Sequence, residues 1–240
     1  MTQPLRLYEL TGADDSCRFS PYCWRIRLAL AHKGLPVETV AWRFHEKEAI
    51  AFSGQGKVPV LVDGDQCVSD SWTIAEYLDR QYPERPALVG DASLKATTRF
   101  INQWVADSVH PALARLILPD VHGVLDEADQ DYFKRTREAA FGVSLEALAG
   151  QRETSLQAFR DILKPLRSTL AVQDYLAGEA PAYADHIVFR RLSVGADRQC
   201  PGVAGPGRSH HRLVRADARR LRWRCAPGTR GSRAVGRCRA

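Results

Sequence analysis

Several marks of membrane, secreted and metal-binding proteins are missing from this chain of 240 residues. No apolar run approaches the roughly 18 residues that a membrane span needs, and the N-terminus lacks a basic start followed by an apolar stretch. The six cysteines form no CxxC pair and show no zinc-like spacing with histidine: Cys17, Cys23, Cys67, Cys200, Cys225 and Cys238. We therefore expect a cytoplasmic protein that contacts no membrane and holds no metal.

Lysine and glutamate are both absent from residues 190–240, which makes the overall net charge of +6 misleading. This segment holds fourteen arginines against Asp197 and Asp217, a net charge of +12, so residues 1–189 carry −6. The segment also holds seven glycines and three prolines and has no sustained apolar period. It is predicted to form no core of its own, so the basic overall charge says nothing about the function of residues 1–189.

The stretch Cys17–Gly34, CRFSPYCWRIRLALAHKG, carries the first functional signal. Ser20 followed by Pro21 is typical of a helix N-cap and first turn, and Cys23, Ile26 and Leu30 then recur at helical spacing. Unpaired N–H groups and the helix dipole favour an anion there, so a thiolate near the Ser20 hydroxyl would have a lowered pKa. Taken alone, Ser20 is better explained as a plain cap, and only the motifs that follow in the chain favour the functional interpretation.

Around this helix the chain predicts a compact α/β unit. Residues 5–10, 37–44, 58–62 and 66–69 have strand character, and Asp63-Gly64 marks a hairpin turn. Ser71 is expected to cap a helix that ends near residue 81. Pro59 cannot donate to a sheet, so it fits either the start of a strand or a cis bond in a functional turn.

The following residues predict helices. A Pro/Gly-rich linker is expected at 84–94, and helical patterns cover roughly 94–118, 127–141 and 145–170, with a further helix near 182. Pro111 and Pro165 are expected to kink or break two of these helices. The predicted organisation is an α/β domain over 1–83, a linker over 84–94, an all-α domain over 95–189, and an Arg/Gly-rich tail over 190–240.

An α/β unit with a proline-led strand before an all-helical domain resembles the cytosolic glutathione transferases over about residues 1–189. The residues that carry this resemblance are Ser20-Pro21, Val58-Pro59-Val60-Leu61 and Asp70-Ser71. It implies a thioredoxin-like N-terminal domain, a helical C-terminal domain altered after residue 189, glutathione as co-substrate, a small hydrophobic electrophile as second substrate, and a homodimer.

The resemblance also implies a role for each motif. Ser20 would face the glutathione sulfur, and the backbone of Val58, freed by a cis Pro59, would pair with the cysteinyl residue. The Ser71 hydroxyl and nearby N–H groups would hold the γ-glutamyl carboxylate, while Asp70 would accept the ammonium. Lys57 would reach the glycine carboxylate. Ordinary alternatives stay open: Asp70-Ser71 as a plain cap and Lys57 as a solvated charge.

Five segments are similar to the bacterial β-etherases, which cleave aryl ethers with glutathione: SPYCWRIRLALAHKG, VPVLVD, SDSWTIAEYLD, YPERPAL and YADHIVF. The acceptor pocket would then involve Arg18, Phe19 and Trp104, although core or surface roles explain these residues as well. A rival hypothesis is a glutaredoxin-like thiol exchanger, since SPYC resembles that active site with its first cysteine replaced by serine. It requires Cys23 on the buried helix face or the more open Cys17.

The tail does not continue the resemblance. One hypothesis is a frameshift, because permitted codons for residues 190–223, read one base later, can encode a Trp-bearing helical pattern typical of the family. The alternative is a transferase-fold binding protein whose basic tail holds an acidic partner such as nucleic acid, which we consider the less favoured hypothesis.

Overall fold

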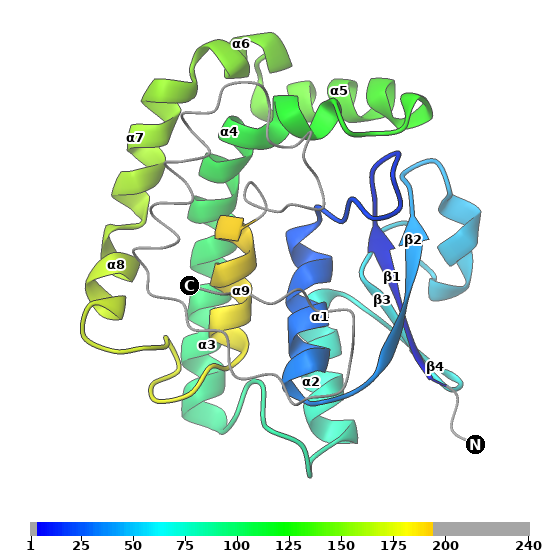
Figure 1. Ribbon diagram of the computed structural model, residues 1–240, viewed down its shortest axis with the longest axis vertical. Helices are drawn as coiled ribbons and strands as arrows, with labels where there is room; N and C mark the ends of the chain where they lie inside the picture. Colours follow the sequence, from blue (N-terminus) through cyan, green and yellow to red (C-terminus); the bar gives the residue numbers. More distant parts are fainter. Residues whose placement is uncertain (1–3, 194–240) are drawn as a thin grey trace.

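The computed structural model describes residues 4–193 and begins with a four-stranded sheet and its helices (Figure 1). In chain order these elements are β1 Leu5–Leu10, α1 Pro21–His32, β2 Val37–Trp42, the 3-10 helix η1 Lys47–Ser53, β3 Val60–Asp63, β4 Gln66–Ser69 and α2 Ser71–Gln81. The strand order is β2-β1-β3-β4, in which β1 is parallel to β2 and antiparallel to β3. The predicted β-α-β unit, hairpin and helix are therefore confirmed.

Strand β1 pairs with β2 and β3, and alternating side chains explain which of its faces is buried. Leu5 and Leu7 are buried and Arg6 between them is exposed, as the two-residue period of a strand requires. The buried side chains pack with Ile26 of α1 and Leu78 of α2 in one hydrophobic cluster. Both helices lie on the side of the sheet that faces the rest of the molecule (Figure 1).

Every further named element of the described residues is a helix. They are α3 Ala92–Trp104, the π-helical segment η2 Val105–Val109, α4 His110–His122, α5 Glu127–Phe141, α6 Leu145–Gly150, α7 Arg152–Ile162, α8 Lys164–Leu170 and α9 Tyr183–Ser193. The helix predicted over 127–141 is confirmed residue for residue. Helix α3 begins inside the segment expected to be linker, because Asp91 caps it through the Leu94 N–H at 2.9 Å.

Proline positions modify the two long helices that the sequence predicts. Helix α3 passes into α4 through η2, just before Pro111, which lacks an N–H to continue the regular ladder. Pro119 lies within α4. The segment 145–170 is three short helices, and Pro165 stands in the first turn of α8. An additional break at Gln151, between α6 and α7, was not predicted.

Helix α9 joins the two parts of the molecule. It packs against α1 on one side and against α3 and α4 on the other (Figure 1). Tyr183 and Ile187 of α9 belong to the same hydrophobic cluster as Leu30 of α1 and Val105 of η2. The sheet region and the helical region therefore share one continuous core.

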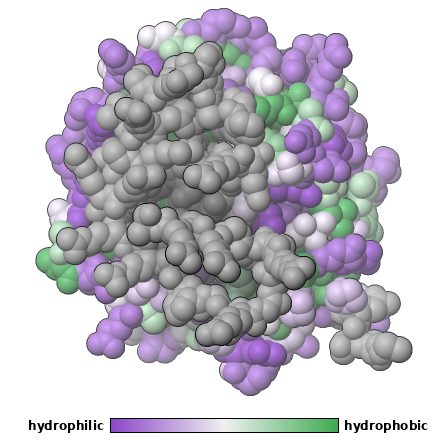
Figure 2. Space-filling view, in the orientation of Figure 1, coloured by the Kyte–Doolittle hydropathy of each residue, from purple (hydrophilic) through white to green (hydrophobic). Residues whose placement is uncertain are grey.

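Within the part of the chain that is described, no helix combines the length and the apolar character needed to cross a bilayer. On the face seen in Figure 2, hydrophilic side chains form most of the visible described surface, and hydrophobic side chains occur in small groups. The predicted Arg/Gly-rich tail, residues 190–240, lies almost wholly outside the described residues.

Candidate active site

Ser20 is the N-cap of α1, as predicted. Its backbone is extended, with φ −67° and ψ 118°, and its Oγ accepts a hydrogen bond from the Cys23 N–H at 3.4 Å. Pro21 occupies the first turn, where its missing N–H costs nothing. The cap uses a lone pair of Oγ, so the hydroxyl proton remains able to donate to an anion at the helix N-terminus.

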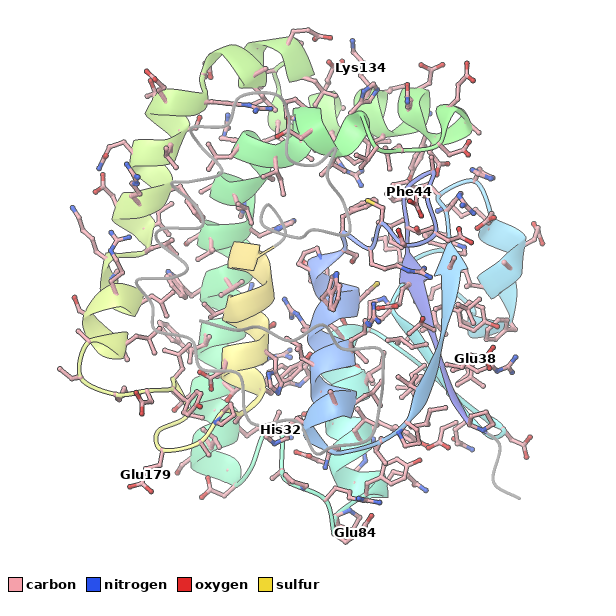
Figure 3. All side chains as sticks on the ribbon, viewed as in Figure 1. His32, Glu38, Phe44, Glu84, Lys134 and Glu179 are labelled. Carbon is pink, nitrogen blue, oxygen red and sulfur yellow. The ribbon has the colours of Figure 1, made fainter. Side chains whose placement is uncertain are left out.

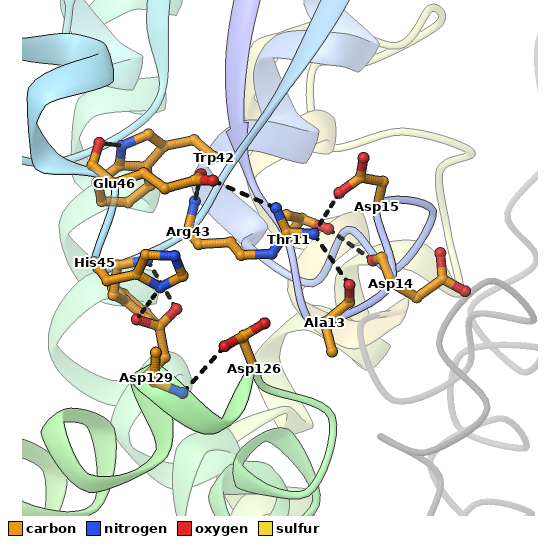
Figure 4. A network of polar contacts seen from close by, with 12 residues as sticks. Thr11, Ala13, Asp14, Asp15, Trp42, Arg43, His45, Glu46, Asp126 and Asp129 are labelled. Carbon is orange, nitrogen blue, oxygen red and sulfur yellow. Dashed lines mark hydrogen bonds and ion pairs between the residues drawn. The ribbon is translucent and has the colours of Figure 1, made fainter.

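The loop that precedes Ser20 is held by contacts with Trp42 and Arg43 at the end of β2. The Thr11 N–H donates to the Trp42 carbonyl of β2 at 2.9 Å, and the Arg43 guanidinium donates to the Ala13 carbonyl at 3.0 Å and pairs with Asp15 at 2.5 Å (Figure 4). A Cβ on Gly12 would lie 2.4 Å from the Val124 carbonyl oxygen, so only glycine fits there. These contacts fix the approach to α1, and sequence reasoning missed the role of Arg43.

A second contact ties the end of β2 to the helical region. The Asp129 carboxylate on α5 is 1% exposed and accepts the Phe44 N–H at 3.0 Å. Its other oxygen lies 3.0 Å from Nδ1 of His45 (Figure 4). The Phe44 ring packs against Tyr132 and Phe133 of α5 (Figure 3). The α/β unit is thus anchored to α5 close to the loop that leads to Ser20.

The Val58–Pro59 peptide bond is cis, which the family resemblance implies. Pro59 is buried directly before β3, and Val58 is half-buried. Lys57 is exposed, and its backbone carbonyl accepts a hydrogen bond from the Gln55 side chain at 2.7 Å. The position of Lys57 is compatible with both a ligand contact and a solvated charge.

Asp70 is the N-cap of α2, which corrects the prediction that Ser71 caps this helix. The carboxylate Oδ1 of Asp70 accepts the N–H groups of Trp72 and Thr73, each at 3.0 Å, and the Thr73 hydroxyl at 3.2 Å. Asp70 has φ 71°, an uncommon value for a residue other than glycine. Ser71 is the first helical residue and is 3% exposed. Asp70 has the non-helical backbone of a cap and is itself a favoured capping residue, whereas Ser71 already has a helical backbone, so the cap falls one residue before the predicted position.

The sheet register brings the three predicted motifs to one end of the sheet. Tyr8 near the end of β1 pairs with Val60 at the start of β3, and Val60 pairs with Ser69 at the end of β4. The loop to Ser20, the cis Pro59 and the Asp70 cap all adjoin this row of residues. Two helix N-termini and a proline-led strand therefore meet at the same sheet end.

Neither cysteine near Ser20 has the character of a reactive thiol. Cys23 is 0% exposed, and burial, reinforced by the nearby Glu9 carboxylate, raises the pKa of its thiol to about 12. Cys17 is 4% exposed, which corrects the expectation that it is open to solvent. Reactive thiols require a lowered pKa and access to solvent, so the geometry disfavours the thiol-exchange hypothesis.

The residues considered for an acceptor pocket have structural surroundings. Phe19 is buried in a hydrophobic cluster with Leu10 and Trp42. The Arg18 guanidinium donates to the Glu9 carbonyl at 3.3 Å, and burial lowers the pKa of Arg18. Trp104 is half-buried against the main core. Core packing of Phe19 and Trp104 and the hydrogen bond of Arg18 to the Glu9 carbonyl are the simpler explanation.

Comparison with known proteins agrees with this geometry. Residues 16–86 match the family model of the glutathione S-transferase N-terminal domain, and residues 96–195 match that of the C-terminal domain. The glutathione S-transferase-like protein ustS of Aspergillus flavus is 30% identical over 226 residues, which cover 79% of each chain. A zeta-class glutathione S-transferase of Euphorbia esula is 37% identical over 112 residues, and this match spans about half, 47%, of the relative's length and 45% of the present chain.

Solved structures show the same fold. A glutathione S-transferase of Ceriporiopsis subvermispora, crystallised in complex with glutathione, superposes with a TM-score of 0.80 at 23% identity and covers 92% of this chain and 94% of its own. Glutathione transferase GSTFuA2 of Phanerochaete chrysosporium gives a TM-score of 0.72 at 25% identity, covering 91% and 98%. The fold is a thioredoxin-like domain followed by a helical domain. The chain belongs to the glutathione S-transferase family.

Proposed function

We propose that this protein is a glutathione transferase in which enzyme-bound glutathione thiolate attacks an electrophilic carbon. The observation that carries the proposal is the meeting of the Ser20 cap, the cis Pro59 and the Asp70 cap at one end of the sheet. Family membership supports it, as does the glutathione present in the Ceriporiopsis relative. Two helix N-termini at one site suit a ligand with separated negative groups.

Each part of glutathione has a chemically suitable partner in this proposal. The Asp70 carboxylate accepts the γ-glutamyl ammonium, and the Ser71 N–H and hydroxyl donate to the adjacent carboxylate. The Val58 backbone pairs with the cysteinyl backbone next to Pro59. Lys57 is exposed beside this strand and is assigned to the glycine carboxylate. This places the sulfur at the N-terminus of α1, in front of Ser20.

The chemistry then needs no covalent enzyme intermediate. The Ser20 hydroxyl donates a hydrogen bond to the sulfur anion, and the N-terminus of α1 adds a favourable field. The thiol loses its proton to solvent because the site favours the anion. The thiolate forms a carbon–sulfur bond, and the bond from that carbon to the leaving group breaks with its electron pair. Ser20 stabilises the nucleophile and is not itself consumed.

For the electrophile we propose a small hydrophobic molecule, with an aryl ether next to a ketone as the specific candidate. The support is the similarity of five segments to the bacterial β-etherases, including SPYCWRIRLALAHKG and YADHIVF. In that reaction the leaving group is an aryl oxide. A β-aryl ether ketone therefore tests this substrate, and an activated aryl halide tests transfer in general.

We also propose a domain division, an oligomeric state and an origin for the C-terminal tail. We propose the division into domains at 1–83 and 95–189, and a homodimer, for which Phe100 on α3 and Phe52 in η1, 74% and 55% exposed, are available apolar contacts. Size-exclusion chromatography with light scattering tests the dimer. For the tail we favour a frameshift, since the family match ends at residue 195. Sequencing genomic DNA across codons 185–195 tests it, and salt-dependent nucleic-acid binding tests the basic-tail alternative.

The decisive experiment for the main proposal measures glutathione binding by calorimetry and product formation with both electrophiles. We expect binding and glutathione-dependent turnover by the wild-type protein and by a Cys23→Ser variant. Loss of activity in Cys23→Ser with glutathione binding intact would instead favour thiol exchange. Failure of the wild-type protein to bind glutathione would refute the proposed function.

A further inference from the structure

A long-range hydrogen bond reaches the start of α2 from the helical region, and it joins residues 112 positions apart. The Tyr183 hydroxyl on α9 donates to the Ser71 carbonyl at 2.5 Å. The Tyr183 side chain is 0% exposed, and its ring meets Trp72 edge to face with centroids 6.0 Å apart. The contact is therefore dry and packed, and it lies one residue from the Asp70 cap.

The phenol is held as a donor by its surroundings. Burial raises the pKa of Tyr183 to about 12, while the Arg25 guanidinium beside it opposes that shift, so the hydroxyl stays protonated near neutral pH. Arg25 is 2% exposed and is itself fixed by the Asn102 side-chain oxygen on α3 at 2.8 Å. Tyr183 is thus oriented from α1 and α3 as well as from its own helix.

The hydrogen bond acts on the peptide unit between Ser71 and Trp72. The N–H of that same unit donates to Oδ1 of Asp70 at 3.0 Å. Hydrogen bonds in series strengthen one another, so a donor on the Ser71 carbonyl reinforces the Trp72 N–H as a partner for the carboxylate. Asp70 holds a φ of 71°, which a non-glycine residue keeps only when its surroundings impose it.

We propose that Tyr183 is a positioning residue for the γ-glutamyl-binding turn, acting through the Ser71 carbonyl to fix the Asp70 carboxylate. This inference rests on the proposed function, because it assigns Tyr183 a role in binding the amino end of glutathione. It makes the helical region a contributor to a ligand site built wholly from residues of the sheet region. Tyr183 touches no part of the ligand itself.

The test compares two ligands with three proteins. The ligands are glutathione and its analogue with glutaryl in place of γ-glutamyl, which lacks the ammonium. The proteins are the wild type, Tyr183→Phe and the control Tyr82→Phe, which removes a hydroxyl bonded to Asp63 at 2.6 Å at the opposite end of α2. Calorimetry gives each dissociation constant, and thermal unfolding checks that each variant is folded.

For Tyr183→Phe we expect glutathione to bind about threefold to tenfold more weakly, the range for loss of one hydrogen bond, with the glutaryl analogue unchanged. Tyr82→Phe should bind both ligands as the wild type does. Equal glutathione affinity in Tyr183→Phe and wild type would overturn the inference, as would an equal loss for both ligands. Wild-type protein that binds no glutathione would overturn the proposed function itself.

A second variant keeps the inference testable if Tyr183→Phe does not fold. Asn102→Ala retains the phenol and removes the oxygen that fixes Arg25. We expect it to weaken glutathione binding about twofold through a less well-held Tyr183, again without effect on the glutaryl analogue. An unchanged glutathione affinity in folded Asn102→Ala would contradict the proposal.

Discussion

The sheet region and the helical region use the same capping chemistry to different ends. Ser20 and Asp70 cap α1 and α2, and Ser144 and Asp126 cap α6 and α5 in the same way. In the sheet region, strand pairing places the two caps at one end of the sheet. In the helical region no strand register gathers the caps. A helix N-terminus becomes part of a site when the topology brings a second one beside it.

Polar contacts around Asp79 hold the segment that connects the sheet region to the helical region. Lys33 at the end of α1 is 1% exposed and pairs with Asp79 of α2 at 2.8 Å. The Asp79 carboxylate also accepts the N–H groups of Leu88 and Val89, each at 2.9 Å, and so holds the segment that leads to α3. At the same end of α1 lies His32 (Figure 3), and its ring meets that of His186 on α9 edge to face, with centroids 5.3 Å apart.

The largest expected effect on stability comes from removing these carboxylate contacts with Asp79→Ala. The change removes the carboxylate from the buried Lys33 ammonium, which keeps only the Tyr82 carbonyl at 3.2 Å, and it leaves the N–H groups of Leu88 and Val89 without this acceptor. We expect the free energy of unfolding to fall by about 3–5 kcal/mol. Urea unfolding followed by circular dichroism measures it. The control is Asp161→Ala in the exposed pair with Lys164 at 2.9 Å, which should leave the midpoint unchanged. Similar urea midpoints for both variants would show that the Asp79 contacts contribute little to stability.

Removing the Ser20 hydroxyl, to which we assign stabilisation of the glutathione thiolate, should mainly affect turnover. For Ser20→Ala we expect kcat/KM with an activated aryl halide to fall by about 10²–10³, the loss typical of one donor to a developing or bound anion. The pKa of the bound glutathione thiol should rise toward its free range. Ultraviolet titration of the thiolate measures this. Unchanged turnover and thiol pKa would refute the assignment of Ser20.

The pH dependence of stability should report on His186, a buried histidine of α9. Burial, with a smaller contribution from His32, lowers the pKa of His186 to about 3. The unfolded chain takes up a proton near the ordinary value of about 6.5, whereas the folded chain does not, so stability falls as pH drops from about 6.5 toward 3. The slope reaches roughly 1.4 kcal/mol per pH unit.

His186→Leu should flatten this part of the profile, because leucine occupies the buried position without a proton to gain. Urea unfolding between pH 4.5 and 7.5 compares the two proteins. A wild-type slope that persists in the variant would assign the pH dependence to another group.

The smallest expected effect belongs to the cap in the helical region. Ser144 accepts the Ala147 N–H at 3.1 Å at the start of α6, much as Ser20 does for α1. Ser144→Ala should cost about 1 kcal/mol of stability and leave glutathione binding and turnover unchanged. Thermal unfolding and steady-state kinetics measure both. A loss of turnover comparable to that of Ser20→Ala would contradict the assignment of a catalytic role to the Ser20 cap and a purely stabilising role to the Ser144 cap.

Local patterns predict many of the elements well. The strands Leu5–Leu10 and Gln66–Ser69 and the helix Glu127–Phe141 have the bounds that the sequence predicts. Each has a clear period and strong end signals. The strand expected at 58–62 begins at Val60, because the cis bond before Pro59 precedes the ladder. The strand expected to reach Phe44 ends at Trp42, where the backbone turns toward Asp129.

The sequence by itself determined that Ser20 caps α1 and which proline precedes β3, because capping and proline geometry act over a few neighbouring residues. It located the start of α2 but assigned its cap to Ser71 instead of Asp70. Only the tertiary structure decided that these motifs meet, through the register of β1, β3 and β4. It also decided that Tyr183 reaches Ser71, that Asp129 holds Phe44, and that Cys17 is buried. Those contacts depend on how distant segments pack, and no local period in the chain encodes them.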